Sequence, residues 1–401
     1  MIKREFYLGK IEPFVAKPVI KIITGMRRVG KSVLMKQLID LLGKRGVSKK
    51  NILYINKESL EFDFLKDYRD LNNYVNGKME KCRRKKYLFI DEIQEIKGWE
   101  KTINSIFAAG GSDIYITGSN AQLLASEIST LISGRYIEFN IYPLGFTEFI
   151  EFRGGRAKDK EEEFNNYLKY GGLPGIHYFD LREEVVYQYL NSIYDTIVLK
   201  DIIRRNSLRN FELLENIYKY IFHNIGNIFS AKKISDYLKS QKLNVGVDTI
   251  QNYLKYLTST FTAFKVKRFD LKGKRILEIY EKYYAGDLGI RHSITGYNTD
   301  DISALLENII YLELKRRGYN ITIGKLYNTE IDFIAKKEDQ IKYIQVCYIL
   351  ASKEVVDREF KPLLRIKDNY PKYVLSMDKV FGKDYKGIKR INIIDFLLSN
   401  W

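Results

Sequence analysis

The feature that most constrains the fold is a glycine-bounded loop at residues 25–32. These residues read Gly-Met-Arg-Arg-Val-Gly-Lys-Ser and fit the phosphate-loop pattern G-x-x-x-x-G-K-[ST] at every fixed position. The loop follows the β-branched run Val19–Thr24, which predicts a buried strand. It precedes Ser32–Ile39, whose apolar spacing predicts an amphipathic helix. The sequence therefore predicts a strand–loop–helix unit that holds phosphate at a helix N-terminus.

Each part of this loop has a chemical role in holding phosphate. Glycines let successive backbone N–H groups turn inward toward phosphate oxygens. Lys31 can reach the terminal phosphates as a point charge, and the hydroxyl of Ser32 can ligate Mg²⁺. A magnesium-bound triphosphate is therefore the expected ligand. The residues predicted to bind it are Gly25, Arg27, Arg28, Val29, Gly30, Lys31, Ser32 and Val33.

A second nucleotide motif lies at the end of the apolar run Tyr87–Asp91, where Glu92 follows. The motif is an apolar strand that delivers two acids at its carboxyl end, which is where ligands of open α/β sheets bind. Asp91 is expected to hold Mg²⁺, directly or through water. Glu92 is expected to orient and deprotonate the attacking water.

Two further motifs contribute polar groups to the predicted site. The run Asp113–Thr117 predicts a strand, and Ser119 or Asn120 beyond it is expected to bond the γ-phosphate or the attacking water. Asn120 is also a plausible cap for a helix, because Ala-Gln-Leu-Leu follows it. Arg135 comes just before the predicted strand Tyr136–Ile141. We expect it to point toward a neighbouring subunit's nucleotide and to neutralise developing charge; the alternative is a surface arginine.

The amino-acid composition limits which binding partners and which cellular compartment are expected for the protein. Lys and Arg total 67 against 50 Asp and Glu, a formal net charge of +17, which favours an anionic partner, either a membrane surface or, preferably, nucleic acid. The alternative is a basic surface that serves only solubility. Cys82 and Cys347 are the only cysteines, which excludes a disulfide framework and favours the cytoplasm. No signal peptide or bilayer-spanning run is found, so no membrane partner is expected. His177, His223 and His292 show no metal-binding spacing.

The chain is predicted to be α/β, in four parts. Residues 1–155 alternate strands with helices, which predicts a largely parallel sheet. Residues 156–210 predict a helical lid or linker, and residues 211–285 predict three helices with a basic hairpin, the pattern of a winged helix-turn-helix. Residues 286–401 are predicted to form the fourth part, which from about Ser303 onward reads helix, three strands, helix. The strands predicted for the first part are Val19–Thr24, Asn51–Asn56, Tyr87–Asp91, Asp113–Thr117 and Tyr136–Ile141.

The winged-helix pattern predicts contact with DNA. Residues 248–255 would lie in or along a major groove, and base-reading side chains are few there, so binding that is independent of sequence is expected. The alternative is a winged helix that serves as a lid or binds protein. The wing residues expected to contact phosphates are Lys267, Arg268, Lys272, Lys274 and Arg275.

These motifs, in this order, resemble the AAA+ superfamily of P-loop ATPases. More narrowly, the chain resembles bacterial and archaeal AAA+ ATPases that carry a C-terminal domain of unknown function numbered 4143. Further marks of this resemblance are Thr-Gly-Ser-Asn at 117–120, Gly-Arg-Tyr at 134–136, Tyr-Pro-Leu-Gly-Phe-Thr-Glu-Phe at 142–149 and Gly-Gly-Leu-Pro at 171–174. It implies ATP and Mg²⁺ as cofactors and the roles given above for the site residues. Pro174 then belongs to a lid element that touches adenine, although this turn is equally a loop without a ligand.

The C-terminal part resembles the restriction-nuclease-like fold, the PD-(D/E)xK type. Glu307 and Asp332 stand where two acids of that pattern belong. The strand that should carry Glu-x-Lys has Gln345 in place of the acid and Cys347 in place of the lysine. Because Gln is neutral and Cys supplies no positive charge, we predict a nuclease-like domain without robust cleavage.

The function predicted from sequence is Mg²⁺-dependent ATP hydrolysis by a homo-oligomeric AAA+ ring, coupled to remodelling of DNA or movement along it. The alternative is an ATP-dependent switch that engages a protein partner and ignores DNA.

Overall fold

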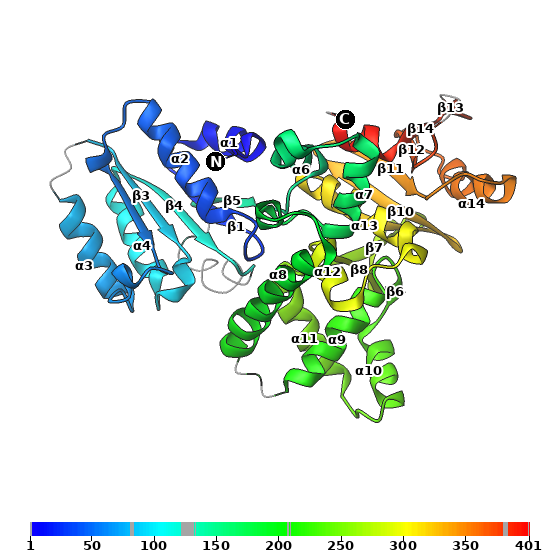
Figure 1. The fold of residues 1–401 in the computed structure, drawn as a ribbon, viewed down its shortest axis with the longest axis horizontal. Coiled ribbons are helices and arrows are strands. Elements are labelled where there is room, and N and C mark those ends of the chain that lie inside the picture. The colour runs from blue at the N-terminus through cyan, green and yellow to red at the C-terminus, as the bar shows by residue number, and fades with distance from the viewer. Residues whose placement is uncertain are drawn as a thin grey trace. The chain divides into compact units, whose positions relative to one another are not determined.

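The chain folds into two units, each with its own sheet (Figure 1). The computed structural model describes residues 2–80, 84–121, 132, 134–206, 208, 210–379, 384–399 and 401. The first unit is Met1–Ile141 with Ser259–Phe261, and the second is Tyr142–Thr258 with Thr262–Trp401. Cys82 and the helix considered after Asn120 lie outside the described residues. The four-part division of the chain stays a prediction.

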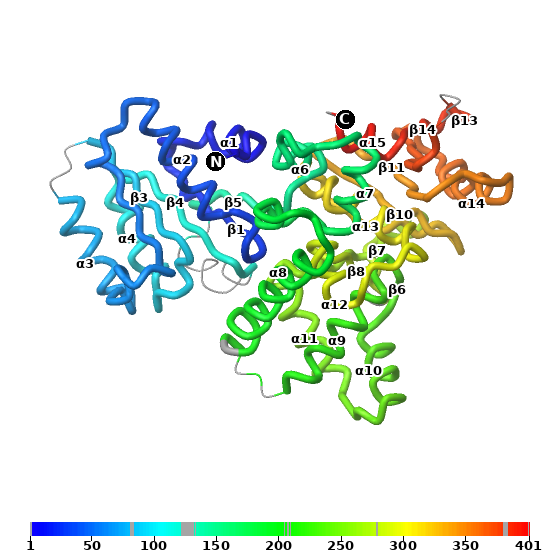
Figure 2. The backbone as a smooth tube through the Cα atoms, in the orientation of Figure 1, coloured from blue at the N-terminus to red at the C-terminus, as the bar shows by residue number. Residues whose placement is uncertain are grey.

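Five parallel strands form the sheet of the first unit, in the order β2-β3-β4-β1-β5. Each predicted strand is confirmed to within one residue at either end. Figure 2 shows β1 beside β5, although the two are far apart in the sequence. The strands are β1 Ile20–Thr24, β2 Ile52–Asn56, β3 Lys86–Asp91, β4 Ser112–Gly118 and β5 Tyr136–Asn140.

Helices cover both faces of this sheet. Every residue of β1 is buried, as expected for a central parallel strand. Ile20 and Ile22 pack into a core with apolar residues of α3 and α4. The helix α2 lies on the other face, where it contacts β3 and β4. The helices are α1 Glu5–Ile11, α2 Lys31–Lys44, α3 Tyr68–Met79 and α4 Trp99–Ala109.

A nine-stranded mixed sheet organises the second unit, in the order β13-β14-β12-β11-β10-β9-β7-β8-β6. Its strands β11, β12 and β14 run parallel, and β7 pairs in parallel with β9. The strands are β6 Ile228–Phe229, β7 Ala263–Asp270, β8 Arg275–Ala285, β9 Asn320–Leu326, β10 Thr329–Lys337, β11 Gln340–Val346, β12 Lys372–Ser376, β13 Asp384–Tyr385 and β14 Ile388–Asn392.

The helices predicted between residues 211 and 257 are confirmed as α9, α10 and α11, and the two strands of the basic hairpin as β7 and β8. The order predicted for the C-terminal part, helix, three strands, helix, is incomplete. Three more strands and a helix follow α14, namely β12, β13, β14 and α15. The helices of this unit are α6 Phe146–Arg153, α7 Lys160–Tyr170, α8 Glu183–Thr196, α9 Phe211–His223, α10 Ala231–Ser240, α11 Val247–Ser259, α12 Leu288–Thr295, α13 Ile302–Arg316, α14 Lys353–Leu364 and α15 Ile393–Leu398. A π-helix, Ile197–Arg204, follows α8.

None of the helices in the described part of the chain has the length and apolar character needed to cross a membrane.

Candidate nucleotide-binding site

The predicted phosphate loop connects β1 to α2 and has the backbone that such a loop needs. Gly25 has a φ of +146°, and a Cβ there would lie 2.3 Å from the carbonyl oxygen of Ile141, so only glycine fits. Gly30 has a φ of +99° and stands at the N-cap of α2. Because glycine has no side chain to cap the helix, the first backbone N–H groups of α2 stay available for an anion.

Lys31 is the first residue of α2 and its side chain is buried, with 4% exposed. Its Nζ donates hydrogen bonds to the carbonyl oxygens of Gly25 at 3.0 Å and Met26 at 3.2 Å. The same nitrogen lies 3.6 Å from Oε1 of Glu92. Lys31 is thus held by the loop and one carboxylate, at the place where a phosphate would compete for it.

Asp91 and Glu92 come together with the loop because β3, β4 and β1 are neighbours that end at the same edge of the sheet. Asp91 is buried and accepts hydrogen bonds from the hydroxyls of Tyr54, at 3.0 Å, and Thr117. Glu92 has a φ of +54°, and its backbone N–H donates to the Thr117 hydroxyl at 3.0 Å. The turn at Glu92 directs two successive side chains from one strand end into the site.

The carboxylate of Glu92 is buried, but its neighbours favour its ionised form. Burial raises its pKa, but Lys31, the Gln94 amide, Arg27 and the Ser119 hydroxyl together outweigh burial and lower the pKa below its ordinary value. An ionised carboxylate beside a phosphate loop can accept a proton from water.

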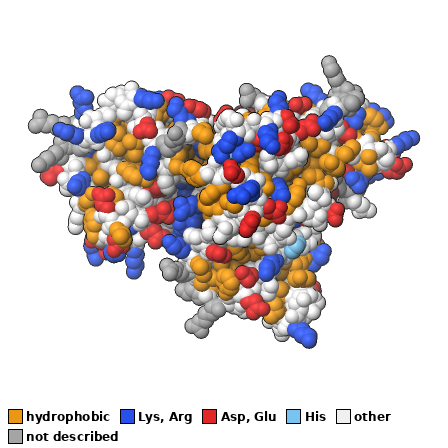
Figure 3. All heavy atoms as spheres, in the orientation of Figure 1, with side chains coloured by type: hydrophobic (Ala, Val, Ile, Leu, Met, Phe, Trp, Pro, Cys, Tyr) orange, Lys and Arg blue, Asp and Glu red, His pale blue; other side chains and the backbone are white. Residues whose placement is uncertain are grey.

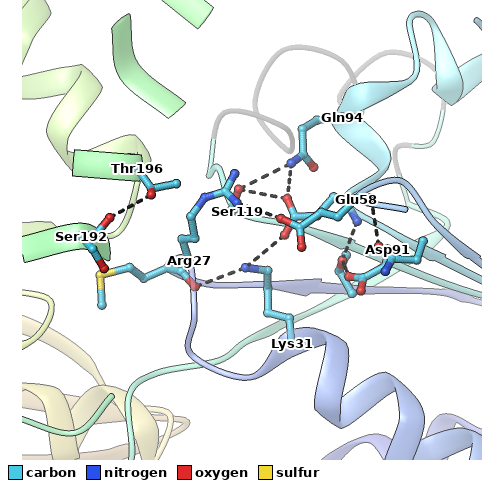
Figure 4. Close-up of polar contacts among 12 residues, drawn as sticks. Arg27, Lys31, Glu58, Asp91, Gln94, Ser119, Ser192 and Thr196 are labelled. Carbon is cyan, nitrogen blue, oxygen red and sulfur yellow. Dashed lines mark hydrogen bonds and ion pairs between the residues drawn. The ribbon is translucent and has the colours of Figure 1, made fainter. Parts of the chain in front are cut away.

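Ser119 and Asn120 follow β4 and are both fully buried at this edge. The Ser119 hydroxyl donates to Oε2 of Glu92 at 3.1 Å. The side-chain amide of Gln94 donates to the same oxygen and lies 3.5 Å from Ser119 Oγ. Lys31, Ser119 and Gln94 point toward one another in Figure 4. Gln94 was not predicted from the sequence, where its one signal is its position two residues beyond Glu92.

The remaining loop residues lie around this centre. Arg27 is buried, and its guanidinium contacts Glu58 at 2.9 Å. Arg28 is exposed and has a φ of +67°. Ser32 and Val33 are half-buried in the first turn of α2, and Val29 is fully buried.

Arg135 lies away from its own phosphate loop. It directly precedes β5, which runs parallel to β1, whereas the loop follows β1. Arg135 therefore lies at the amino ends of the parallel strands, and the loop lies at their carboxyl ends. The exposed guanidinium donates to Oδ1 of Asn104 at 2.6 Å. Ser133, part of the same predicted motif, lies outside the described residues.

Pro174 belongs to the second unit, where it begins the 3₁₀ helix Pro174–Tyr178. The turn before it is fixed by Asp287, whose carboxylate accepts from the backbone N–H of Gly172 at 2.8 Å and of Ile290 at 3.0 Å. Burial raises the pKa of Asp287 to about 6.

The second unit brings Glu307, Asp332 and Gln345 together, and beside them lies a lysine that was not predicted from the sequence. Lys282 of β8 is 3% exposed, and its Nζ contacts Glu307 at 2.9 Å and Glu330 at 2.5 Å. Nothing in the local sequence around Lys282 links it to these acids.

Backbone contacts fix the other two residues of this group. The backbone N–H of Asp332 donates to Oε1 of Gln345 at 3.2 Å. The side-chain Oδ2 of Asp332 accepts from the backbone N–H of Val346 at 2.8 Å. Burial and the nearby Glu307 raise the pKa of Asp332. Burial lowers the pKa of Lys282, but Glu307, Asp332 and Glu330 outweigh it, and the net shift is upward. The ammonium of Lys282 is thus paired with the surrounding carboxylates.

The residues of the first unit fit a magnesium-bound triphosphate. The glycine cradle at Gly25 admits no side chain, and the N-terminus of α2 offers uncapped N–H groups. Ser32 and Asp91 supply the oxygen ligands that Mg²⁺ prefers.

Comparison with known proteins agrees with this geometry. The family model described as an AAA domain matches residues 17–150, and a model described as a domain of unknown function, numbered 8612, matches residues 161–301. The domain numbered 4143 that the resemblance implied is therefore not shown. An uncharacterised protein of Haemophilus influenzae is 38% identical over 403 residues, covering 100% of this chain and 99% of that protein.

Two more distant matches extend the comparison. An uncharacterised protein of Methanocaldococcus jannaschii is 30% identical over 397 residues, covering 94% of this chain and 85% of that protein. A Walker-type ATPase of Pyrococcus abyssi has a similar fold, with a TM-score of 0.53 and 16% identity, covering 73% of this chain and 96% of that one. The chain therefore belongs to the same family as the Haemophilus influenzae protein, and its first unit is an AAA domain with the fold of a P-loop ATPase.

Proposed function

We propose that the protein hydrolyses ATP in the presence of Mg²⁺. The observation that carries the proposal is the contact between Lys31 and Glu92, 3.6 Å apart at the carboxyl ends of β1, β3 and β4. One residue is a ligand for phosphate and the other a base for water, and Asp91 stands beside them.

Each residue then has a definite task. The backbone N–H groups of the loop and of the first turn of α2 bind phosphate oxygens, and Lys31 exchanges its carbonyl partners for the terminal phosphates. Ser32 and Asp91 would hold Mg²⁺, which supplies charge neutralisation between the phosphates. Glu92 accepts a proton from the attacking water.

Two variants test this proposal. Lys31→Ala should abolish ATP binding, because the loop loses its cation. Glu92→Gln should keep binding and lower the hydrolysis rate by roughly a hundredfold or more, because the amide is no base. The control is Lys36→Ala, an exposed lysine of α2 that should behave as the wild type. Hydrolysis at the wild-type rate by Glu92→Gln would overturn the proposal.

We extend the proposal to DNA binding through a winged helix made of α9–α11 and the hairpin β7–β8. The net charge of +17 and the exposed hairpin side chains Lys267, Lys272, Lys274 and Arg275 support it. On the face drawn in Figure 3, basic side chains are mixed with acidic ones. The hydrolysis assay, repeated with duplex DNA over a salt series, tests this part. DNA that neither stimulates hydrolysis nor binds in a salt-dependent way would end it.

One observation favours the second candidate function, an ATP-dependent switch that engages a protein partner. The hairpin strand β7 pairs with β9, so the wing is part of a continuous sheet rather than a free arm. ATP-dependent assembly that ignores DNA would favour this second function.

A further inference from the structure

Gln94 makes the two oxygens of the Glu92 carboxylate unequal. It lies in the 3₁₀ turn Ile93–Glu95 that follows β3, and its side-chain amide donates to Oε2 of Glu92. Ser119 donates to the same oxygen at 3.1 Å. The other oxygen, Oε1, faces Lys31 at 3.6 Å. One oxygen is thus anchored by two donors, and the other is turned toward the phosphate loop.

The orientation of the Gln94 amide is determined by its neighbour. If its oxygen and nitrogen were exchanged, a carbonyl oxygen would face the Glu92 carboxylate, which is repulsive. In the present orientation Oε1 of Gln94 is buried and has no hydrogen-bond partner among the described residues. An unsatisfied buried acceptor costs about 1–3 kcal/mol. An unsatisfied buried acceptor is not expected at a residue that only stabilises the fold. It is more often found at a residue with a role in a functional site.

The backbone of Glu92 makes such an anchor necessary. Its φ of +54° lies in the left-handed region, which a glutamate rarely adopts, and the turn is held by the bond from its N–H to Thr117. The side chain beyond this turn still has three rotatable bonds. Two donors on one oxygen fix its direction.

We propose that Gln94 is a positioning residue for the hydrolysis proposed above, on which this inference rests. By holding Oε2 it keeps Oε1 of Glu92 aimed at the water between base and phosphate once Lys31 has moved to the phosphates. In the step, the water oxygen bonds to the γ-phosphorus while the bond from that phosphorus to the bridging oxygen of ADP breaks. The water proton passes to Oε1, and ADP and phosphate leave.

The test is a double-mutant cycle between Gln94→Leu and Glu92→Gln, in the full chain. Leu has a similar size and removes the unsatisfied oxygen, so the thermal unfolding temperature should be retained. Gln94→Leu alone should lower kcat roughly ten- to a hundredfold, because a misdirected base costs that much, and leave the affinity for a non-hydrolysable ATP analogue unchanged. In the Glu92→Gln background the same change should have no further effect on kcat. Glu95→Gln, an exposed neighbour in the same turn, is the matched control.

The possible outcomes separate the two proposals. If the wild type hydrolyses ATP, Glu92→Gln does not, and Gln94→Leu matches the wild type, the role of Gln94 is refuted and the proposed function stands. Equal losses from Gln94→Leu with and without Glu92 refute it as well, because Gln94 then acts independently of the base. If the wild type itself shows no hydrolysis, both proposals fall.

Discussion

The ring of His177 lies against Phe149 and Phe152, with centroid distances of 4.7 and 5.7 Å, and neither ring nitrogen has a partner among the described residues. Burial, with Arg153 and Arg156 nearby, lowers its pKa from 6.5 to about 4. Between these pH values the unfolded chain binds a proton that the folded chain does not. The free energy of unfolding therefore falls as the pH drops through this range, and His177 accounts for about 2 kcal/mol of loss at pH 5.

We therefore expect His177→Phe to remove that part of the acid sensitivity. Phe keeps the ring against its aromatic neighbours and has no nitrogen to protonate. Denaturant unfolding at pH 8 and pH 5 should show a smaller difference in the variant than in the wild type. The control is His223→Phe, which changes an exposed histidine and should keep the full difference. An unchanged pH dependence in His177→Phe would show that the ring is protonated or solvated in the folded chain.

The positions of residues in the candidate nucleotide site were predictable where the signal is contiguous. Lys31 belongs to a run of eight residues with fixed spacing, and Asp91 and Glu92 end an apolar strand. Gln94 and Lys282 were not predictable, because their partners are fixed by how strands pair and turns close. A lysine in a strand reads as a solvent-facing side chain until its neighbours are known. Long-range juxtaposition of that kind leaves no mark in the local sequence.

At the scale of elements, Lys282 connects three parts of the second unit. The ammonium from β8 meets Glu307 of α13 and Glu330 of β10, and Asp332 of β10 lies within electrostatic reach. A buried charge left without its partner costs about 3–5 kcal/mol. Lys282→Met should therefore destabilise the second unit by about that amount at pH 7.5 in denaturant unfolding. The loss should shrink toward pH 5, since the carboxylates of the variant can then take up protons.

A matched lysine pair on the neighbouring strand provides the control for Lys282. Lys265 of β7 contacts Glu281 at 2.9 Å, but its side chain is 43% exposed. An exposed pair contributes at most about 1 kcal/mol, so Lys265→Met should have little effect. If the two variants lost equal amounts of unfolding free energy, burial would not be the reason that Lys282 contributes to stability.

Helices and strands were predicted correctly where the periodicity of their apolar residues was strong. The β-branched run that became β1 and the apolar spacing of α9–α11 were sufficient to predict them. The strands β12 and β14 were not predicted; Ile388–Asn392, for example, contains two charged residues in succession, which weakens its strand pattern. Short strands in a mixed sheet depend on their neighbours more than on their own pattern.

At the scale of the whole molecule, the position of Arg135 bears on assembly. Its guanidinium is exposed and lies at the edge of the sheet opposite the chain's own loop, so it could act only on a neighbour's nucleotide. If the active form is an oligomer with Arg135 completing the adjacent site, Arg135→Ala should lower hydrolysis by roughly a hundredfold or more while ATP still binds. A residue that only anchors the local fold through Asn104 would affect stability instead.

Mixing two inactive variants decides between these roles. In a mixture of Arg135→Ala with Lys31→Ala, some interfaces pair an intact phosphate loop from the first variant with an intact arginine from the second. Those interfaces alone should hydrolyse ATP, so the mixture should recover a fraction of wild-type activity that neither variant has by itself. Recovery should depend on total protein concentration, because it requires subunits to associate. Arg135→Ala with wild-type activity would remove the arginine from the reaction. A mixture that stays inactive, although light scattering shows that the two variants co-assemble, would place the effect of Arg135 within its own subunit.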